Sequence, residues 1–210
     1  MKNLRYEVIK YAKLLNSKKL SALRSGNISA RYKNGFLITP SGEKYSSLKN
    51  KDIVFVSLKG EFDKKKGIPS SEWRFHQDIY LNKKDAKAIV HAHSNYATAI
   101  AVHCKSIPAF HYMVAMAGGN DIKCAKYATY GTRELSKNIL KALKNRCACL
   151  IGNHGQIAFS EDLSKAFELA EEVENLSKQY ISALKIGKPR ILSSKEMNKV
   201  LSKAKNYKRG

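Results

Sequence analysis

The first predicted element is a helix, indicated by apolar residues that recur on one helical face. These residues are three or four positions apart, with one adjacent pair, at Leu4, Val8, Tyr11, Leu14 and Leu15. The spacing is typical of an amphipathic α-helix, which we expect over residues 4–20. Lysine and arginine side chains interrupt the apolar positions, so the segment differs from a secretion signal.

Alternating apolar and polar positions follow this helix. Strand-like stretches are separated by turn residues at Asn34-Gly35 and by the sequence PSG at 40–42, a pattern that predicts a hairpin. The segment DIVFVSLKGEF at 52–62 is rich in β-branched and aromatic residues and predicts a buried strand. The chain is therefore expected to open with a helix, a hairpin and a further strand.

Helical and strand-like segments alternate through the rest of the chain. We expect a helix over 71–82 capped by Ser70 or Ser71, a strand over 86–94, a buried helix over 95–104, two strands around a turn within 147–159, and a long amphipathic helix over 161–186. No glycine-rich phosphate loop, repeat or low-complexity linker interrupts this alternation. The sequence therefore predicts a layered α/β fold with a single domain over residues 1–210.

Composition indicates an ordinary globular protein. Of its 210 residues 43% are hydrophobic, but the uncharged apolar stretches are far shorter than the roughly 20 residues of a membrane span. We expect no membrane partner and a cytoplasmic location. Four cysteines lack the C-x-x-C spacing of structural zinc or redox motifs, and we expect them to be reduced and mostly buried: Cys104, Cys124, Cys147 and Cys149.

The charge is the unusual bulk property. Thirty-nine lysine and arginine residues against 17 aspartate and glutamate residues give a formal net charge of +22. Such an excess is typical of nucleic-acid binders, but lysines are spread over nearly every segment, the longest run is 64–66, and only eight residues are arginine. We therefore expect a solvated basic surface and no nucleic-acid partner, with a field that attracts small anionic substrates.

Two histidines separated by one residue end the apolar run at 88–93. Because side chains alternate between the faces of a strand, His91 and His93 are expected to project to the same side. A pair of this kind supplies half of a metal site. It is also compatible with surface or hydrogen-bonded histidines that bind no metal.

A third candidate ligand is His154, which lies at a predicted turn between Gly152 and Gly155. Three neutral imidazoles suit a catalytic Zn²⁺, which takes three protein ligands at about 2.0–2.1 Å and keeps a position open. Other divalent ions fit the same residues. The remaining histidines have no partner at ligand spacing and are expected to be structural or hydrogen-bonded: His76, His103 and His111.

Six ordered stretches between residues 20 and 160 together resemble the class II aldolases. They are SGNISARY, LITPSG, PSSEWRFH, VHAH, PAFHYMVAMAGGNDIKCAKYATYGTREL and NHGQIA. The third and fifth are most similar to the fuculose-phosphate aldolase branch of a family that also includes ribulose-phosphate 4-epimerases and methylthioribulose-phosphate dehydratases. The resemblance implies a three-layer α/β domain with a central, mainly antiparallel sheet, assembled as a homotetramer with active sites between subunits.

The resemblance also implies one zinc ion per subunit. His91, His93 and His154 match the family's ligands, and Glu72 resembles a glutamate that completes the zinc shell and then acts as the catalytic base. Without the family, the default interpretation of Glu72 is an acidic residue in the first turn of a helix.

The resemblance further implies a phosphate site, formed by small and neutral residues at three turns. They are Gly26, Asn27, Ser41, Gly42, Ser70 and Ser71. Backbone amides and hydroxyls at turns and helix N-termini bind anions without a lysine, although each pair is also compatible with ordinary turn and cap chemistry. Relatives often carry a threonine where this chain has Arg24, which either contacts the phosphate or points to solvent.

Two tyrosines match residues that complete the family's active site. Tyr112 resembles a tyrosine that reaches the neighbouring subunit's site and protonates or orients the aldehyde oxygen, with a buried core tyrosine as the alternative. Tyr207 resembles a tail tyrosine that closes over the site, three residues before the chain ends.

The implied reaction is the reversible cleavage of a ketose 1-phosphate, with L-fuculose 1-phosphate as the first candidate, to dihydroxyacetone phosphate and L-lactaldehyde. In the condensing direction Glu72 removes a carbon-bound proton while zinc polarises the carbonyl. Family alternatives are a pentulose-5-phosphate 4-epimerase, which typically carries aspartate in place of Glu72, and a methylthioribulose-1-phosphate dehydratase. A basic nucleic-acid-binding protein with a structural metal is the alternative from another class.

Overall fold

A seven-stranded sheet forms the centre of the protein, for which the computed structural model describes residues 4–207 and the side chains of residues 4–204. Across the sheet the strands are β3 (Val54–Ser57), β2 (Gly35–Ile38), β1 (Asn27–Tyr32), β4 (Ala88–Ala92), β9 (Gly155–Ser160), β8 (Ala148–Ile151) and β7 (Cys124–Ala125). Neighbouring strands are antiparallel except for the parallel pair β7 and β8. The predicted mainly antiparallel sheet is confirmed.

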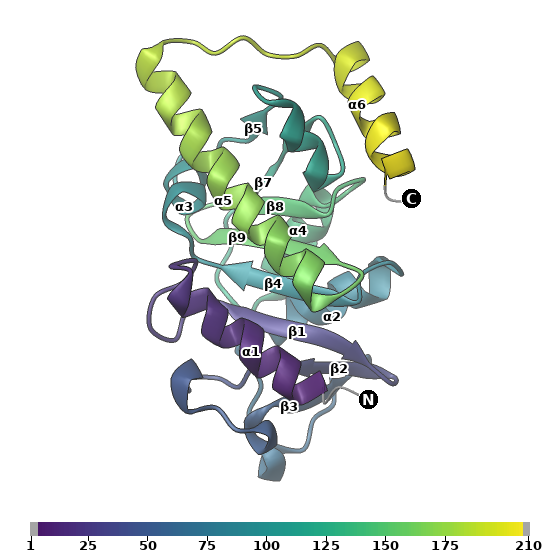
Figure 1. The fold of residues 1–210 in the computed structure, drawn as a ribbon. Helices are drawn as coiled ribbons and strands as arrows, with labels where there is room; N and C mark the ends of the chain where they lie inside the picture. The colour runs from purple at the N-terminus through teal and green to yellow at the C-terminus, as the bar shows by residue number, and fades with distance from the viewer. Residues whose placement is uncertain (1–3, 208–210) are drawn as a thin grey trace.

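Helices cover both faces of this sheet (Figure 1). One face packs against α1 (Leu4–Ser17), α3 (Asn95–Ala101) and α5 (Leu163–Ile186), and the other packs against α2 (Trp73–Asn82) and α4 (Arg133–Ala142). The central strand shows why two cores form: Val90 belongs to the α1 and α5 side, whereas Ile89 belongs to the α2 and α4 side. This arrangement confirms the predicted three-layer α/β class.

Smaller elements extend one end of the molecule. They are the two-stranded sheet of β5 (Ile107–Pro108) and β6 (Asp121–Ile122), the 3-10 helix η4 (Tyr112–Ala117) and the final helix α6 (Ser194–Tyr207). Single 3-10 turns lie at η1 (Tyr45–Ser47), η2 (Asn50–Asp52) and η3 (Lys64–Lys66). Within residues 4–207 no helix is long and apolar enough to cross a membrane.

The N-terminal end of α2 differs from its prediction. Neither Ser70 nor Ser71 is the N-cap; that position belongs to Glu72, whose side chain makes no capping hydrogen bond. The Ser70 hydroxyl instead accepts from the backbone N–H of Glu72 at 3.3 Å, which forms a turn one step before the helix begins at Trp73. The Glu72 carboxylate is thereby free to point away from its own helix.

The strand predicted over 52–62 is also shorter than expected. It ends at Ser57 because this hydroxyl accepts hydrogen bonds from the backbone N–H groups of Lys59 at 3.2 Å and Glu61 at 3.1 Å. A serine side chain that binds the backbone two and four residues ahead stabilises a turn in place of a continued ladder. The apolar residues after Ser57 therefore lie beyond the strand.

Candidate metal centre and active site

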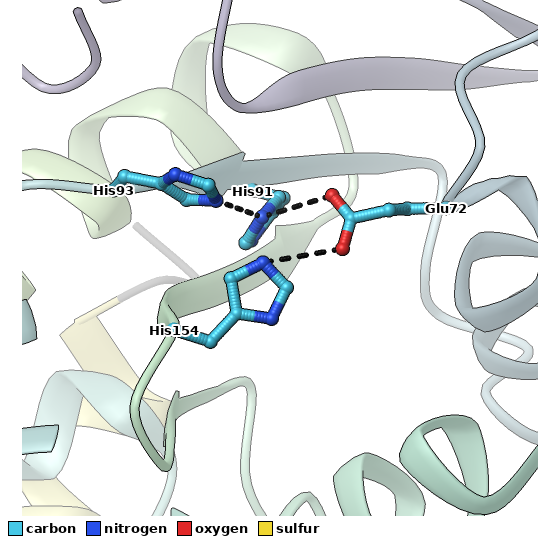
Figure 2. Close-up of side chains that lie close together, drawn as sticks. All are labelled: Glu72, His91, His93 and His154. Carbon is cyan, nitrogen blue, oxygen red and sulfur yellow. Dashed lines mark hydrogen bonds and ion pairs between the residues drawn. The ribbon is translucent and has the colours of Figure 1, made fainter. Parts of the chain in front are cut away.

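Four side chains from three separate segments converge at one end of the central strands (Figure 2). His91 lies inside β4, His93 lies one residue beyond its end, and His154 occupies the turn between β8 and β9. Glu72 comes from the N-cap of α2, on the face of the sheet that this helix covers. The predicted grouping of the three histidines is therefore present in the fold, together with the glutamate.

The distances within this cluster suit a small cation. His91 Nε2 lies 2.9 Å from His93 Nε2 and 3.2 Å from Glu72 Oε2, while His154 Nε2 lies 3.2 Å from Glu72 Oε1. One ligand atom from each residue can be chosen so that all four lie within 4.8 Å of one another. Ligands at about 2.1 Å in a tetrahedral zinc site are themselves separated by about 3.4 Å.

Hydrogen bonds around the cluster leave lone pairs directed at its centre. The Nδ1–H group of His91 donates to the Gln156 carbonyl at 2.8 Å, so that Nε2 carries the free lone pair. Glu72 Oε1 is buried and receives no hydrogen bond from the described residues. Its approach to His154 Nε2 becomes a hydrogen bond only if that nitrogen carries a proton. A cation between these atoms would satisfy both, so the residues fit a divalent metal.

The protonation states favour ligation. Burial alone raises the pKa of Glu72, but the neighbouring His91 and His154 outweigh burial and hold this pKa well below its usual range. Burial, aided by His91 and His154, lowers the pKa of His93 to about 3. At neutral pH the cluster therefore offers an ionised carboxylate and a neutral His93 imidazole, the forms that bind metals.

Two glycines allow the ligand-bearing segments to approach closely. A Cβ on Gly155 would lie 2.4 Å from the Ala92 carbonyl oxygen and 3.1 Å from His93 Cδ2. Gly26 has a φ of +77°, and its Cβ would lie 2.7 Å from the carbonyl oxygen of His91. Any side chain at either position would displace backbone that carries a histidine of the cluster.

A pocket of about 370 Å³ opens beside the four side chains. All six residues predicted to bind phosphate line it, namely Gly26, Asn27, Ser41, Gly42, Ser70 and Ser71, and so do Glu72, His93 and His154. Among the described residues that line it, Arg24 is the only arginine or lysine, and its Nη1 donates to the Gly42 carbonyl at 2.7 Å. Turn residues far apart in the sequence thus share one wall of a polar cavity.

The Asn27 side chain has a partner that the sequence did not predict. Its Nδ2 donates to Glu72 Oε2 at 2.9 Å, and its Oδ1 faces His76 Nε2 at 2.5 Å. The hydrogen-bonding role expected for His76 is therefore confirmed. Because these contacts across 45 and 49 residues depend on the packing of α2 against the sheet, no local pattern in the sequence indicates them.

Neither of the two predicted tyrosines is among the described residues that line this pocket. Tyr112 does not line the pocket; it is 54% exposed in η4 and stacks on His111 with ring centroids 4.9 Å apart. Tyr207 ends α6, and its side chain lies outside the described residues. Three lining residues that the sequence analysis missed are Tyr127, Tyr130 and Asn153.

Comparison with known proteins identifies the family. The sequence profile described as "Class II Aldolase and Adducin N-terminal domain" matches residues 6–181. The chain belongs to the class II aldolase family. The resemblance inferred from the six motifs is confirmed, and the enzyme class that follows for this aldolase is a lyase.

Individual class II aldolases are similar over nearly the whole chain. The L-fuculose phosphate aldolase of Escherichia coli (strain K12) is 50% identical over 184 residues, 87% of this chain and 85% of that protein. The 5-methylthioribulose-1-phosphate/5-deoxyribulose-1-phosphate aldolase of Rhodospirillum rubrum is 47% identical over 204 residues, 97% of this chain and 92% of that protein. A solved structure of an L-fuculose 1-phosphate aldolase superposes with a TM-score of 0.93 at 40% identity, covering 98% of this chain and 97% of that one.

Proposed function

We propose that this class II aldolase reversibly cleaves a ketose 1-phosphate to dihydroxyacetone phosphate and a short aldehyde, with one Zn²⁺ per subunit. L-Fuculose 1-phosphate, which yields L-lactaldehyde, is the first candidate substrate. The observation that carries the proposal is the convergence of His91, His93, His154 and Glu72 beside a pocket lined by neutral hydrogen-bond donors. A metal held by these four residues would polarise the substrate carbonyl and stabilise the negative charge that develops on it.

The phosphate group fits the part of the pocket formed by residues 26–27, 41–42 and 70–71. Backbone N–H groups and serine hydroxyls at these turns can donate to phosphate oxygens, and the N-terminal end of α2 adds a favourable dipole. Arg24 at the rim supplies a positive charge. In this arrangement the phosphate group holds the substrate in place, and the carbonyl carbon of the substrate extends toward Glu72.

Glu72 is the residue that moves the carbon-bound proton. In the condensing direction its carboxylate takes a proton from the hydroxymethyl carbon of dihydroxyacetone phosphate, and that carbon then forms a bond to the aldehyde carbon. In the cleavage direction the hydroxyl on carbon 4 passes its proton to Glu72, the bond between carbons 3 and 4 breaks, and Glu72 returns that proton to carbon 3 of the three-carbon fragment. The burial of Glu72 excludes water that would compete for this proton.

The candidate substrates differ in the aldehyde that they release. Cleavage of any 2-ketose 1-phosphate between carbons 3 and 4 releases dihydroxyacetone phosphate, because the phosphate, the ketone and carbon 3 stay together. The substrates in the names of the two relatives therefore have the same phosphate-bearing half. A 5-deoxy- or 5-methylthio-ribulose 1-phosphate is the second candidate, supported by the 47% identity to the aldolase of that name.

The test is a panel of sugar phosphates given to metal-loaded protein. L-Fuculose 1-phosphate, 5-deoxyribulose 1-phosphate and 5-methylthioribulose 1-phosphate are each assayed for dihydroxyacetone phosphate and for the aldehyde, and metal content is determined by elemental analysis. A pentulose 5-phosphate tests the epimerase alternative, and release of water without cleavage would indicate the dehydratase. If no ketose 1-phosphate yields dihydroxyacetone phosphate, the proposal is wrong.

A matched variant tests the role of the carboxylate. Glu72→Gln keeps the shape and removes the base, so we expect turnover to fall by about 10²–10⁴-fold, the usual contribution of a general base. Ser71→Ala is the comparison, since it removes one exposed hydroxyl from the phosphate side and should act mainly on KM. Unchanged turnover in Glu72→Gln would assign the base elsewhere.

We further propose that the protein forms a homotetramer whose active sites are shared between subunits. We also propose that it is located in the cytoplasm. The exposed position of Tyr112 supports delivery of this side chain to a neighbouring subunit. Mixing Tyr112→Phe and Glu72→Gln subunits tests it: a shared site recovers activity in mixed tetramers, because some sites then receive both intact residues. No recovery in hybrids verified by mass spectrometry would contradict the sharing.

A further inference from the structure

A buried row of hydrogen bonds leads from the interior of the protein to the carboxylate of Glu72. Tyr80 Oη lies 2.8 Å from Ser29 Oγ, which lies 2.7 Å from His76 Nδ1. His76 Nε2 lies 2.5 Å from Asn27 Oδ1, and Asn27 Nδ2 lies 2.9 Å from Glu72 Oε2. None of the four residues behind the carboxylate is more than 2% exposed.

Chemistry fixes the direction in which these groups donate. The ionised carboxylate of Glu72 only accepts, so Asn27 presents its N–H group to it and turns Oδ1 toward His76. His76 Nε2 must then carry the proton. The neutral ring leaves Nδ1 as an acceptor for the Ser29 hydroxyl. Every group in the row donates toward Glu72.

Aromatic packing holds the His76 ring in the required plane. Phe75 stacks on it with ring centroids 4.8 Å apart and an interplanar angle of 23°, and Phe36 lies at 6.4 Å and 18° on the same ring. Phe75 also packs edge-on against His91 at 5.4 Å. His76 therefore has little freedom to reorient and lies directly behind the candidate metal cluster.

We propose that His76 is a positioning residue: by donating from Nε2 to Asn27 it keeps the Asn27 N–H group on Glu72 Oε2 and so leaves Glu72 Oε1 directed at the metal. The inference rests on the metal site of the proposed function. A carboxamide is nearly symmetrical in shape, and only a donor at His76 distinguishes its oxygen from its nitrogen. If the Asn27 side chain turned over, its oxygen would face the carboxylate and repel it.

The first test reads the wild-type protein directly. Nitrogen-15 NMR of the histidine rings is expected to show His76 as the neutral tautomer protonated at Nε2, in metal-free and metal-loaded protein. A ring protonated at Nδ1 alone would overturn the inference, because such a ring cannot donate to Asn27 Oδ1. This measurement requires no variant to fold.

The second test compares variants by their affinity for Co²⁺, whose visible spectrum reports the ligand geometry. His76→Phe retains a flat ring without a donor, and we expect weaker Co²⁺ binding by about tenfold, at the low end of the 10–100-fold losses seen for residues that orient ligands. His76→Gln keeps a donor that can reach Asn27 and should recover most of this affinity. Ile79→Val is the control, a fully buried change in the same helix outside the row.

Kinetics and a double variant separate positioning from general destabilisation. His76→Phe is expected to lower kcat while leaving KM, which reports the phosphate pocket, within about twofold. In a Glu72→Gln background His76→Phe should cause no further loss of Co²⁺ affinity, because the residue acts through Glu72. Ile79→Val should lower the melting temperature without changing either quantity.

The outcomes separate the inference from the proposed function. If wild-type protein fails to bind Co²⁺, the proposed metal site is wrong and the inference is wrong with it. If wild-type protein binds Co²⁺ and His76→Phe binds it equally well with the same spectrum, only the inference is overturned. The inference is also overturned if His76→Phe lowers Co²⁺ affinity by the same factor in the wild-type and Glu72→Gln backgrounds.

Discussion

Gly155 offers the sharpest test of how the strands build the candidate metal centre. In the substitution Gly155→Ala the new Cβ would lie 2.4 Å from the Ala92 carbonyl oxygen, whereas real Cβ atoms essentially never approach another atom within 3.0 Å. Strands β4 and β9 must therefore separate locally by at least about 0.6 Å. The two strands place His93 on one side of the gap and His154 on the other.

The size of this shift decides the expected result. Metal–ligand distances tolerate deviations of only about 0.2 Å, so a movement of about 0.6 Å between two ligands strains or breaks one bond. We expect Zn²⁺ or Co²⁺ affinity to fall by tenfold or more, which corresponds to at least about 1.4 kcal/mol. The overpacked core should also lose about 1–3 kcal/mol of the free energy of unfolding.

The assay is competition for metal with a chromophoric chelator, together with urea unfolding of the metal-free protein. Gly119→Ala is the matched control, because the atoms that its Cβ would meet belong to the side chain of Arg146 rather than to backbone. This control should retain metal affinity within about twofold. If Gly155→Ala binds metal as tightly as the wild type, the close approach of β4 and β9 does not set the ligand geometry.

Three further results are expected. Because burial lowers the pKa of His76 to about 3 from an ordinary 6.5, the unfolded chain binds a proton in this range that the folded protein does not. Urea titrations of metal-free protein should therefore show that, below pH 6.5, the free energy of unfolding of the wild type falls by about 1.4 kcal/mol per pH unit relative to His76→Gln. If the free energies of the two proteins change in parallel with pH, this prediction is wrong. Arg24→Ala should raise KM for a sugar phosphate about two- to fivefold with kcat unchanged, because an exposed ion pair contributes roughly 0.5–1 kcal/mol. If the variant and the wild type have the same KM at low salt, Arg24 does not bind the phosphate. Asp162→Ala removes the N-cap of α5, whose carboxylate accepts from Lys165 N at 2.8 Å, and should cost about 1 kcal/mol in urea unfolding while metal affinity stays constant.

Local periodicity predicted most of the regular elements. The alternation in 86–94 and the helical spacing in 161–186 led to β4 (Ala88–Ala92) and α5 (Leu163–Ile186), with boundaries that differ by a few residues. These patterns are readable because each element buries one face, which fixes its hydrophobic period.

Two helices were not predicted from the sequence, α4 (Arg133–Ala142) and α6 (Ser194–Tyr207). The ten-residue α4 buries Leu135 and Ile139 against the rest of its core, but lysines and polar residues fill most of its sequence. Helix α6 has a lower proportion of apolar residues than α4, and Met197 is the one buried member of the main core among its described side chains. Both helices nevertheless place their apolar residues on one face, so helical periodicity over 133–142 and 194–207 is a signal that could have indicated them.

The linear sequence already contains the donor types that a metal and a phosphate require: an H-x-H pair, a glycine-flanked histidine, a glutamate and three polar turns. How these donors meet depends on the folded chain. The pairing of β4 with β1 and β9 brings Asn27, His91 and His154 together, and the turn before α2 directs Glu72 at them rather than at its own helix. His76 looked like a solitary histidine because its partners lie 47 and 49 residues away. Contacts over such separations follow from the packing of a folded sheet, and a linear pattern does not record them.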